Sequence, residues 1–224
     1  MSLKVIQLLI LCLLVLTTNT YSQKKQITQK DYDSVQTVAE NNFERLAYRE
    51  LTKIENYENG KLVSTETITE ENLPPDKMNW RSIKVSNGNS EKEEIITIGY
   101  VTYRRENGGK WIKEDNEDGD IESNNGVSTN SITSISGQEA PNRKKYTVEE
   151  TKLKNLSVRI YSVTTVYDFA PNVSHTFRRW INSDNLILKA EDTESENGAN
   201  VISRTVSTYE YNPKGIKIEA PKIN

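Results

Sequence analysis

The sequence predicts an α+β protein in which an antiparallel β-sheet follows one N-terminal helix. Three observations support this prediction. The dipeptide Asn-Gly occurs five times, strand-like runs rich in Thr, Val, Ile and Tyr lie between the copies, and one segment near the N-terminus has helical periodicity. Asn and Gly tolerate the positive φ that tight hairpin turns require, so the repeated pair is a strong hairpin signal. Most of the chain is therefore expected to be strand.

Residues 1–22 are expected to be a signal peptide and not part of the fold. Lys4 gives a basic start, an apolar run extends from Val5 to Leu16, and small polar residues then precede a cleavage site expected before Gln23. The run is too short for an ordinary membrane span, although a retained anchor is the alternative. Cys12 lies among leucines without the small residues that precede a lipidated cysteine. Residues 23–224 are then a single exported domain, in the periplasm or outside the cell.

The composition of the exported part excludes several classes of protein. The whole chain has a net charge of −3, and removing residues 1–22 takes away one lysine and no acid, which gives −4. This mild acidity argues against nucleic acid as a partner. No cysteine remains after cleavage, so disulfides cannot form and an apolar core must hold the domain together.

The first expected element after the signal peptide is a helix. Apolar residues recur there at three- and four-residue steps, and Thr28 is a candidate N-cap. They are Tyr32, Val35, Val38, Ala39, Phe43 and Leu46. The same period continues through Leu51 and Ile54, so periodicity alone would extend the helix to about Tyr57. We break it near Ala47, because the residues from Tyr48 onwards lead into Asn59-Gly60 and resemble the first arm of a hairpin.

Two later segments give the clearest strand signals. From Tyr161 to Phe169, apolar and polar residues alternate as in a half-buried strand. From His175 to Ser195, a turn at Asn182–Asn185 joins two strand-like runs, and we expect a hairpin with its arginines on the solvated face. A last strand is expected from Val201 to Tyr211.

The segment at about 114–142 is predicted to be a long polar loop, because it is rich in Asp, Glu, Asn, Ser and Gly. Its first part resembles a calcium loop, with Glu114, Asn116 and Asp118 at ligand positions. Position twelve is Asn125, which cannot supply the bidentate carboxylate that such loops use. A solvated acidic loop is the favoured interpretation.

The chain has little of the equipment that enzymes use. His175 is the single histidine, Gly-x-Ser-x-Gly is absent, and no thiol remains after cleavage. One histidine cannot supply the usual ligands of a zinc site. We therefore expect no catalytic residues, no metal and no cofactor.

Four segments, taken in order, resemble the LolA/LppX-like superfamily of exported half-barrels, which includes RseB-like sensor domains. They are Leu-Pro-Pro-Asp-Lys-Met at 73–78, EEIITIGYVTYRRENGGKW at 93–111, RRWINSDNLILKAE at 178–191 and the closing YEYNPKGIKIEAPK. The resemblance spans about 65 to 222, together with the preceding helix. It implies a curved antiparallel half-barrel of about 8–11 strands with the helix on its concave side.

The resemblance also implies a function. Members carry lipids, acyl chains or lipoproteins, or bind them as a signal. We therefore expect a non-enzymatic carrier of a hydrophobic ligand, with a lipid or a lipidated protein as partner and transient contact with the envelope. The alternative is an envelope sensor or protein-interaction module that has no ligand cavity. The sequence makes no prediction of oligomeric state.

The expected lining of the concave face combines the alternation with the aromatic residues. The apolar face of the run that ends at Phe169 should turn inward, because a curved sheet buries one face. The alternative is that the same residues fill a closed core. The expected lining residues are Tyr100, Tyr103, Trp111, Tyr161, Val163, Tyr167, Phe169, Phe177 and Trp180. Trp180 lies with Arg178 on the face opposite Phe177, so its alternative place is the outer surface or a covering contact.

Overall fold

The computed structural model describes residues 23–115 and 142–223. The expected signal peptide lies outside the described residues, as do most of the expected polar loop and Asn125-Gly126. The two ends of that loop are strand. The elements are β1 (Lys25–Gln26), α2 (Gln29–Phe43), β2 (Tyr48–Glu58), β3 (Lys61–Leu73), β4 (Lys77–Ser86), β5 (Asn89–Ile98), β6 (Val101–Glu106), β7 (Ile112–Asp115), β8 (Asn142–Leu153), β9 (Leu156–Tyr167), β10 (Ala170–Asn182), β11 (Ile187–Glu196) and β12 (Asn200–Tyr211).

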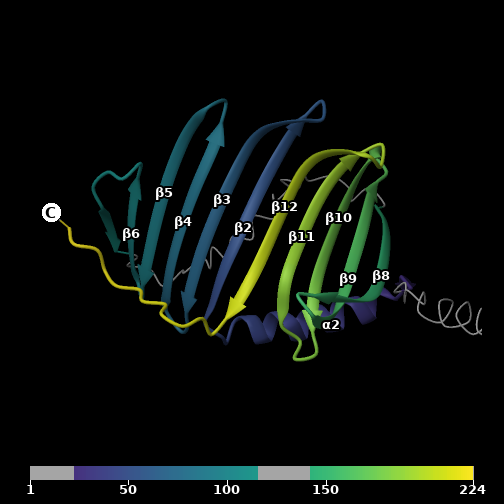
Figure 1. Ribbon diagram of the computed structural model, residues 1–224, viewed down its shortest axis with the longest axis horizontal. Helices are drawn as coiled ribbons and strands as arrows, with labels where there is room; N and C mark the ends of the chain where they lie inside the picture. Colours follow the sequence, from purple (N-terminus) through teal and green to yellow (C-terminus); the bar gives the residue numbers. More distant parts are fainter. Residues whose placement is uncertain (1–22, 116–141, 224) are drawn as a thin grey trace, which may run out of the picture.

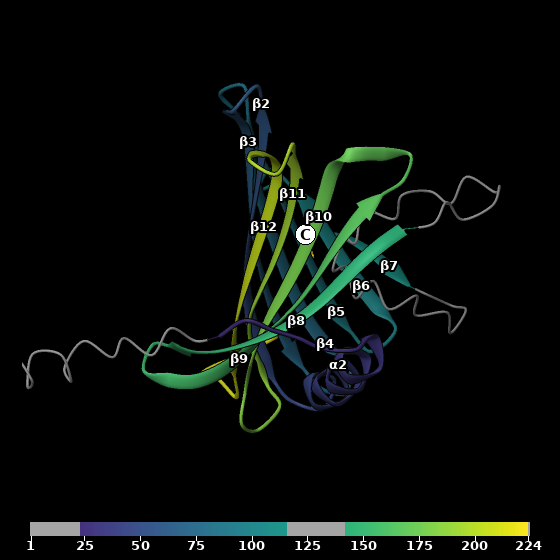
Figure 2. The ribbon, with the colours of Figure 1, turned by 90° about the vertical axis from the view of Figure 1, so that its right-hand side faces the viewer.

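All the strands belong to one antiparallel sheet with the order β1-β8-β9-β10-β11-β12-β2-β3-β4-β5-β6-β7. The two consecutive strands β7 and β8 stand near opposite ends of this order, and the pairing of β12 with β2 joins the two meanders at the centre (Figure 1). The sheet curves around α2 and does not close, so the fold is the expected curved α+β half-barrel (Figure 2). The described residues form twelve strands of this sheet, where about 8–11 were expected. The two-residue β1 and the four-residue β7 are too short to show alternation.

Positive-φ turns join the strands where the sequence predicts them. The pairs Asn59-Gly60 and Asn87-Gly88 form two-residue turns, and Asn107-Gly108 and Asn197-Gly198 also lie between paired strands. At each of these eight residues φ is between 49° and 79°. The hairpin expected from His175 to Ser195 is formed by β10 and β11.

The helix begins where its cap predicts and ends well before Tyr57. The hydroxyl of Thr28 accepts a hydrogen bond from the Asp31 amide at 3.1 Å, and Asp31 returns a bond to the cap, which completes a capping box. After Phe43 the chain turns, and Tyr48 begins β2, so the break placed near Ala47 is confirmed. Tertiary pairing overrides the continuing helical period, because β2 is held on both sides by β12 and β3.

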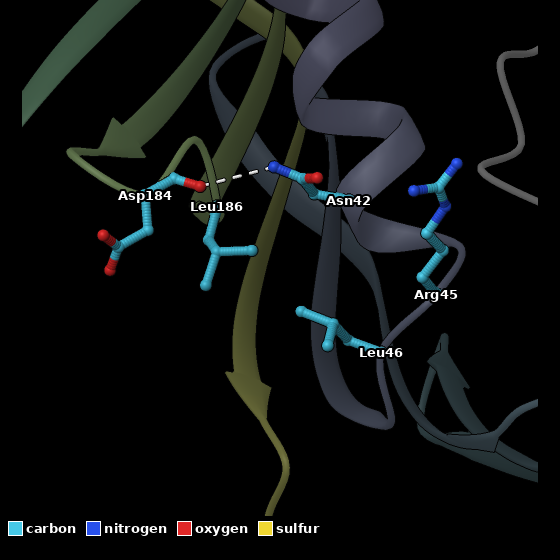
Figure 3. Close-up of a pocket in the computed structure, with 5 residues that line it drawn as sticks. All are labelled: Asn42, Arg45, Leu46, Asp184 and Leu186. Atoms are coloured by element: carbon cyan, nitrogen blue, oxygen red, sulfur yellow. Dashed lines mark hydrogen bonds between the residues drawn. The ribbon is translucent and has the colours of Figure 1, made fainter.

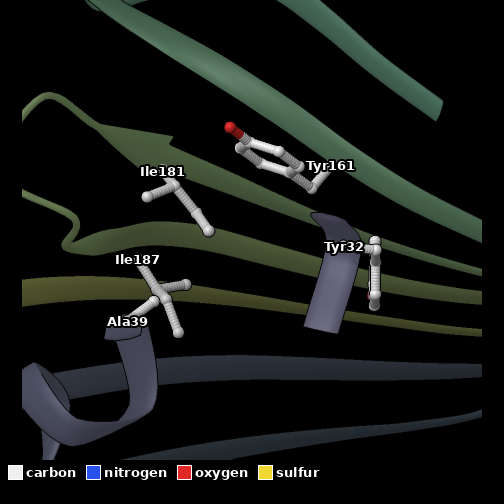
Figure 4. Close-up of a cluster of buried hydrophobic side chains, with 5 residues drawn as sticks. All are labelled: Tyr32, Ala39, Tyr161, Ile181 and Ile187. Carbon is white, nitrogen blue, oxygen red and sulfur yellow. The ribbon is translucent and has the colours of Figure 1, made fainter. Parts of the chain in front are cut away.

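The hydrophobic core lies between α2 and one half of the sheet. Its buried members are Tyr32, Ala39, Tyr161, Ile181 and Ile187, and Ala39 is completely inaccessible (Figure 4). We call β8–β12 the covered half and β2–β7 the open half. Within the described residues, no apolar side chain of β3–β7 is buried, whereas Asn79 and Ser82 are.

Candidate functional site

The contacts of the helix identify the concave face of the sheet. The Phe43 ring lies 4.2 Å from the Tyr48 ring and 5.5 Å from the Tyr209 ring, and Tyr32 lies 5.2 Å from Tyr146. Side chains directly opposite each other in an antiparallel pair share a face, and alternate residues along a strand do too. The register therefore assigns every described strand residue relative to Tyr48, Tyr146 and Tyr209.

Four of the expected lining residues lie on this concave face. Val163 stands opposite both Tyr146 and Phe177, and Tyr161 and Tyr167 follow at even spacing along β9. Tyr161 is buried beneath the helix, whereas Val163, Tyr167 and Phe177 are half-buried. The predicted inward face of β9 is therefore present, and α2 fills part of the space in front of it.

Three expected lining residues lie on the opposite, convex face. Successive cross-strand partners link the concave residue Tyr48 to Thr102 in β6, so Thr102 is also concave; the partners are Asn72, Met78 and Thr97. Tyr103 is the next residue along β6 and therefore lies on the convex face. Trp111 packs under the guanidinium of Arg105, which shares the face of Tyr103, and Trp180 packs under the Lys189 amine. The expected place of Tyr103 and Trp111 on the concave face is corrected, because face depends on register across successive strands and not on aromatic character. Trp180 lies with Arg178 on the face opposite Phe177, as the alternation of that run predicts.

Tyr100 and Phe169 lie in hairpin turns and not within strands. Tyr100 is 63% exposed between β5 and β6, and Phe169 is 70% exposed between β9 and β10. The alternation expected to continue to Phe169 ends at Tyr167, where β9 ends and the chain turns. The Phe169 ring nevertheless lies 5.2 Å from the Tyr167 ring, so it extends the apolar surface at the rim.

The arginines of the His175–Ser195 hairpin are not both on the solvated face. Arg178 is on the convex side, but Arg179 lies on the concave side beneath α2. Its Nη1 donates hydrogen bonds to Gln36 Oε1 and Glu40 Oε1, both at 2.6 Å, and its guanidinium lies 4.9 Å from the Phe177 ring centre. The i, i+4 spacing of Gln36 and Glu40 places both acceptors on the helix face above the sheet.

The single histidine belongs to the same concave surface. His175 Nε2 lies 2.6 Å from Asp192 Oδ1, and Glu194 stands directly opposite His175 in the register. The hydrogen bond that the imidazole donates to the Asp192 carboxylate raises the pKa of His175 above its usual value, against the opposing effect of burial. Burial, with Glu194 and Asp192 nearby, also raises the pKa of Tyr167. The apolar surface formed by Tyr167 and Phe169 therefore has acidic residues at its border.

A shallow depression of about 320 Å³ lies elsewhere, between the end of α2 and the turn that joins β10 to β11 (Figure 3). It is lined by Asn42, Arg45, Leu46, Asp184 and Leu186, and Asn42 Nδ2 donates to the Asp184 carbonyl at 3.3 Å. Sequence reasoning missed it, because its two sides are about 140 residues apart in the chain and no local pattern joins them. The depression is open to solvent and contains no pair of potential catalytic groups.

The described residues contain no group of three His, Cys, Asp or Glu side chains that could hold a metal ion. Among the helices of the described part, none is long and apolar enough to cross a membrane. The resemblance to a calcium loop in Glu114–Asn125 lies largely outside the described residues.

No protein-family model matches the chain, and no curated protein matches it either. Several solved structures are similar to it. One is LprF from Mycobacterium bovis, with a TM-score of 0.46 and 10% sequence identity over 88% of this chain and 99% of that one. Another is a DUF1329 family protein from Desulfovibrio piger, with a TM-score of 0.32 and 9% identity over 84% of this chain and 94% of that one. A third is a putative outer membrane lipoprotein-sorting protein domain from Vibrio parahaemolyticus, with a TM-score of 0.30 and 8% identity over 83% of this chain and 95% of that one. The open curved sheet with α2 inside it is consistent with the LolA/LppX-like fold that the sequence resembles.

Proposed function

We propose that this protein is an exported, non-enzymatic carrier that binds a hydrophobic ligand, a lipid or a lipoprotein acyl chain. The ligand would lie on the apolar rim, which consists of Val163, Tyr167, Phe169 and Phe177. The observation that carries the proposal is that these side chains adjoin the helix-covered core but stay half-buried or exposed. They lie on β9, on β10 and in the turn between them. These two strands extend beyond α2 (Figure 2).

The hydrophobic effect is sufficient to hold such a ligand. Burial of one CH₂ group contributes about 0.8 kcal/mol, so an acyl chain of about sixteen carbons has roughly 12 kcal/mol available before the losses of association. No charged anchor is required. A shallow surface also allows release, which a carrier needs.

The surroundings of His175 support a non-enzymatic role. The Asp192 carboxylate occupies Nε2 of the imidazole, and the adjacent Ser174 projects from the opposite face of the strand. A serine nucleophile would have to lie within hydrogen-bonding distance of the imidazole, and Ser174 does not face it.

A second candidate function is an envelope sensor or protein-interaction module. The observation that favours it is the filled space between α2 and β9–β11, where Ala39, Tyr161 and Ile181 are buried (Figure 4). A closed interior of this kind has no room for an acyl chain, which would then be limited to the rim.

Binding of a fluorescent fatty-acyl probe to residues 23–224 tests the carrier. Phe169→Asp and Phe177→Asp should each weaken binding at least about tenfold, because they place a charge on the apolar rim. Tyr100→Asp is the matched control, since Tyr100 is also an exposed aromatic residue in a hairpin turn, but of the open half. It should leave binding unchanged.

The carrier proposal is overturned if the parent protein binds no acyl probe, or if the folded rim variants bind the probe as tightly as the parent does. Native mass spectrometry of protein purified from its own envelope should also find copurified lipid. If the parent binds no probe and carries no lipid, the interaction module is favoured.

A further inference from the structure

The open half of the sheet distributes its charges unequally between its two faces. On the convex face, each of the four acidic residues of β2–β7 forms an ion pair with a neighbouring cation. The pairs are Glu55 with Lys53 at 2.6 Å, Glu71 with Arg49 at 2.7 Å, Glu94 with Arg105 at 2.5 Å and Asp115 with Lys113 at 2.7 Å. The negative charges of this face are therefore neutralised within the protein.

The concave face of the same strands is strongly acidic. Glu58 and Lys61 stand opposite each other beyond the register shift at Asn56 and Tyr57 and are left aside. Over the rest of these strands the register places seven glutamates on the concave face and two cations, Lys84 and Arg104. In the described part of the chain, Glu93 is the one member of the seven that forms an ion pair, with Arg104 at 3.2 Å. The seven are Glu50, Glu66, Glu70, Glu91, Glu93, Glu106 and Glu114.

Neutral hydroxyl groups hold the three glutamates nearest to the centre of the sheet. Tyr48 donates to Glu70 at 2.5 Å, Thr52 donates to Glu50 at 2.6 Å, and Ser82 donates to Glu66 at 2.5 Å. A hydroxyl donor satisfies a carboxylate oxygen and fixes its position but supplies no positive charge. The carboxylates are thus ordered without being neutralised.

Apolar side chains lie among these carboxylates. Ile54, Ile68, Trp80 and Ile95 belong to four successive strands, share the concave face and are half-buried. One row of cross-strand partners contains both kinds of side chain: Glu50 is paired with Glu70, Glu70 with Trp80, and Trp80 with Ile95. The surface is therefore amphipathic as well as acidic, and α2 packs on the other half of the sheet and on Tyr48 at the start of β2.

We propose that the concave face of the open half is a docking surface for a basic amphipathic segment of a partner protein. Lysine or arginine side chains would pair with the concave carboxylates that form no ion pair within the described residues, which include the hydroxyl-held ones, Glu91 and Glu106. Aliphatic side chains would cover Trp80 and the isoleucines. Such pairing gives specificity and speeds association. The chain's own residues 116–141 are a poor occupant, since they contain five acidic residues and neither lysine nor arginine.

This docking surface is separate from the apolar rim, so its test does not depend on acyl binding. The test uses residues 23–224 and a labelled peptide of alternating lysine and leucine, with a glutamate–leucine peptide of equal length for comparison. The concave variant Glu91→Lys with Glu106→Lys reverses two exposed charges that form no ion pair within the described residues. The convex variant Glu55→Lys with Asp115→Lys changes the net charge by the same amount.

Fluorescence anisotropy at low salt should show that the basic peptide binds and the acidic one does not. The concave variant should lose at least about tenfold in affinity and the convex variant less than about twofold, because close charge pairs at an interface are strongly coupled. Equal losses in both variants would mean that net charge alone attracts the peptide and would overturn the proposal. The proposal would also be overturned if neither variant changes the affinity for the basic peptide, or if the acidic peptide binds as tightly as the basic one.

The remaining possible occupant is a second copy of this chain that inserts its convex face. Sedimentation of the unliganded parent tests for it. We expect a monomer. Self-association that the concave variant abolishes would identify a second copy as the occupant and would overturn the proposal of a foreign partner.

Discussion

The covered and open halves are built in the same way but hold together differently. Both are antiparallel meanders with positive-φ hairpin turns, and both present Thr, Val, Ile and charged residues in alternation. In the covered half, α2 converts the concave face into a core with Tyr161, Ile181 and Ile187 buried. In the open half the same face carries glutamates held by hydroxyl groups.

The difference shows that strand formation and core formation are separate properties of this sheet. The open half is held by its hydrogen-bonded ladder, by cross-strand ion pairs such as Arg49–Glu71 and by its continuity with β12. The covered half adds hydrophobic burial against the helix. Stability should therefore be concentrated on one side of the β12–β2 pairing.

The largest expected effect comes from removing apolar volume from the covered half. Ile181→Ala should lower the free energy of unfolding by about 2–5 kcal/mol, because the side chain is 3% exposed and packs in the core. Ile68→Ala is the matched change in the open half, where the side chain is half-buried, and should lose about 1 kcal/mol or less. Urea denaturation measures both, and equal losses would show that the halves do not differ.

A smaller effect is expected from the cap of the helix that covers one half. Thr28→Ala should cost about 1 kcal/mol, because it removes the acceptor of the Asp31 amide. Thr37→Ala is the control, since its exposed hydroxyl only bonds back to the Asp33 carbonyl at 3.0 Å. It should stay within about 0.5 kcal/mol of the parent. An unchanged stability of Thr28→Ala would indicate that the helix contributes little to the sheet.

The next test concerns Glu70, a half-buried carboxyl group of the open half. Burial raises the pKa of Glu70, and Glu50 beside it acts in the same direction. A raised folded pKa means that stability is fully present below the unfolded value of about 4.5 and decreases as the pH rises through the folded pKa. Glu70→Gln should therefore lose less stability between pH 4 and pH 7, in urea titrations at a series of pH values. If Glu70→Gln and the parent lose the same amount of stability over this pH range, the pH dependence does not come from Glu70.

The smallest effect is expected at the edge of the covered half, where His175 meets Asp192. The pKa of His175 is raised, so the pair stabilises the fold below the unfolded value of about 6.5 and the contribution disappears as the pH rises through the folded pKa. NMR titration of this single histidine should give a midpoint above 6.5, and Asp192→Asn should lower it. A midpoint that Asp192→Asn does not change would assign the shift to another cause.

Local sequence patterns were sufficient for the elements of this protein. The cap at Thr28, the four described Asn-Gly turns, the alternation from Tyr161 to Tyr167 and the β10–β11 hairpin all follow from preferences of a few adjacent residues. Those preferences act over one turn of helix or one hairpin, so a single sequence contains them. The order of the motifs also predicted an open, curved α+β sheet.

Only the tertiary structure decided which face each residue occupies. Tyr103 and Trp111 were expected on the concave side, but the register accumulated across five strands places them on the convex side. Arg179 was expected in solvent, but α2 covers it and supplies Gln36 and Glu40 as acceptors. A change of one residue in register exchanges the two faces, and register depends on pairing between distant segments, which no local pattern contains.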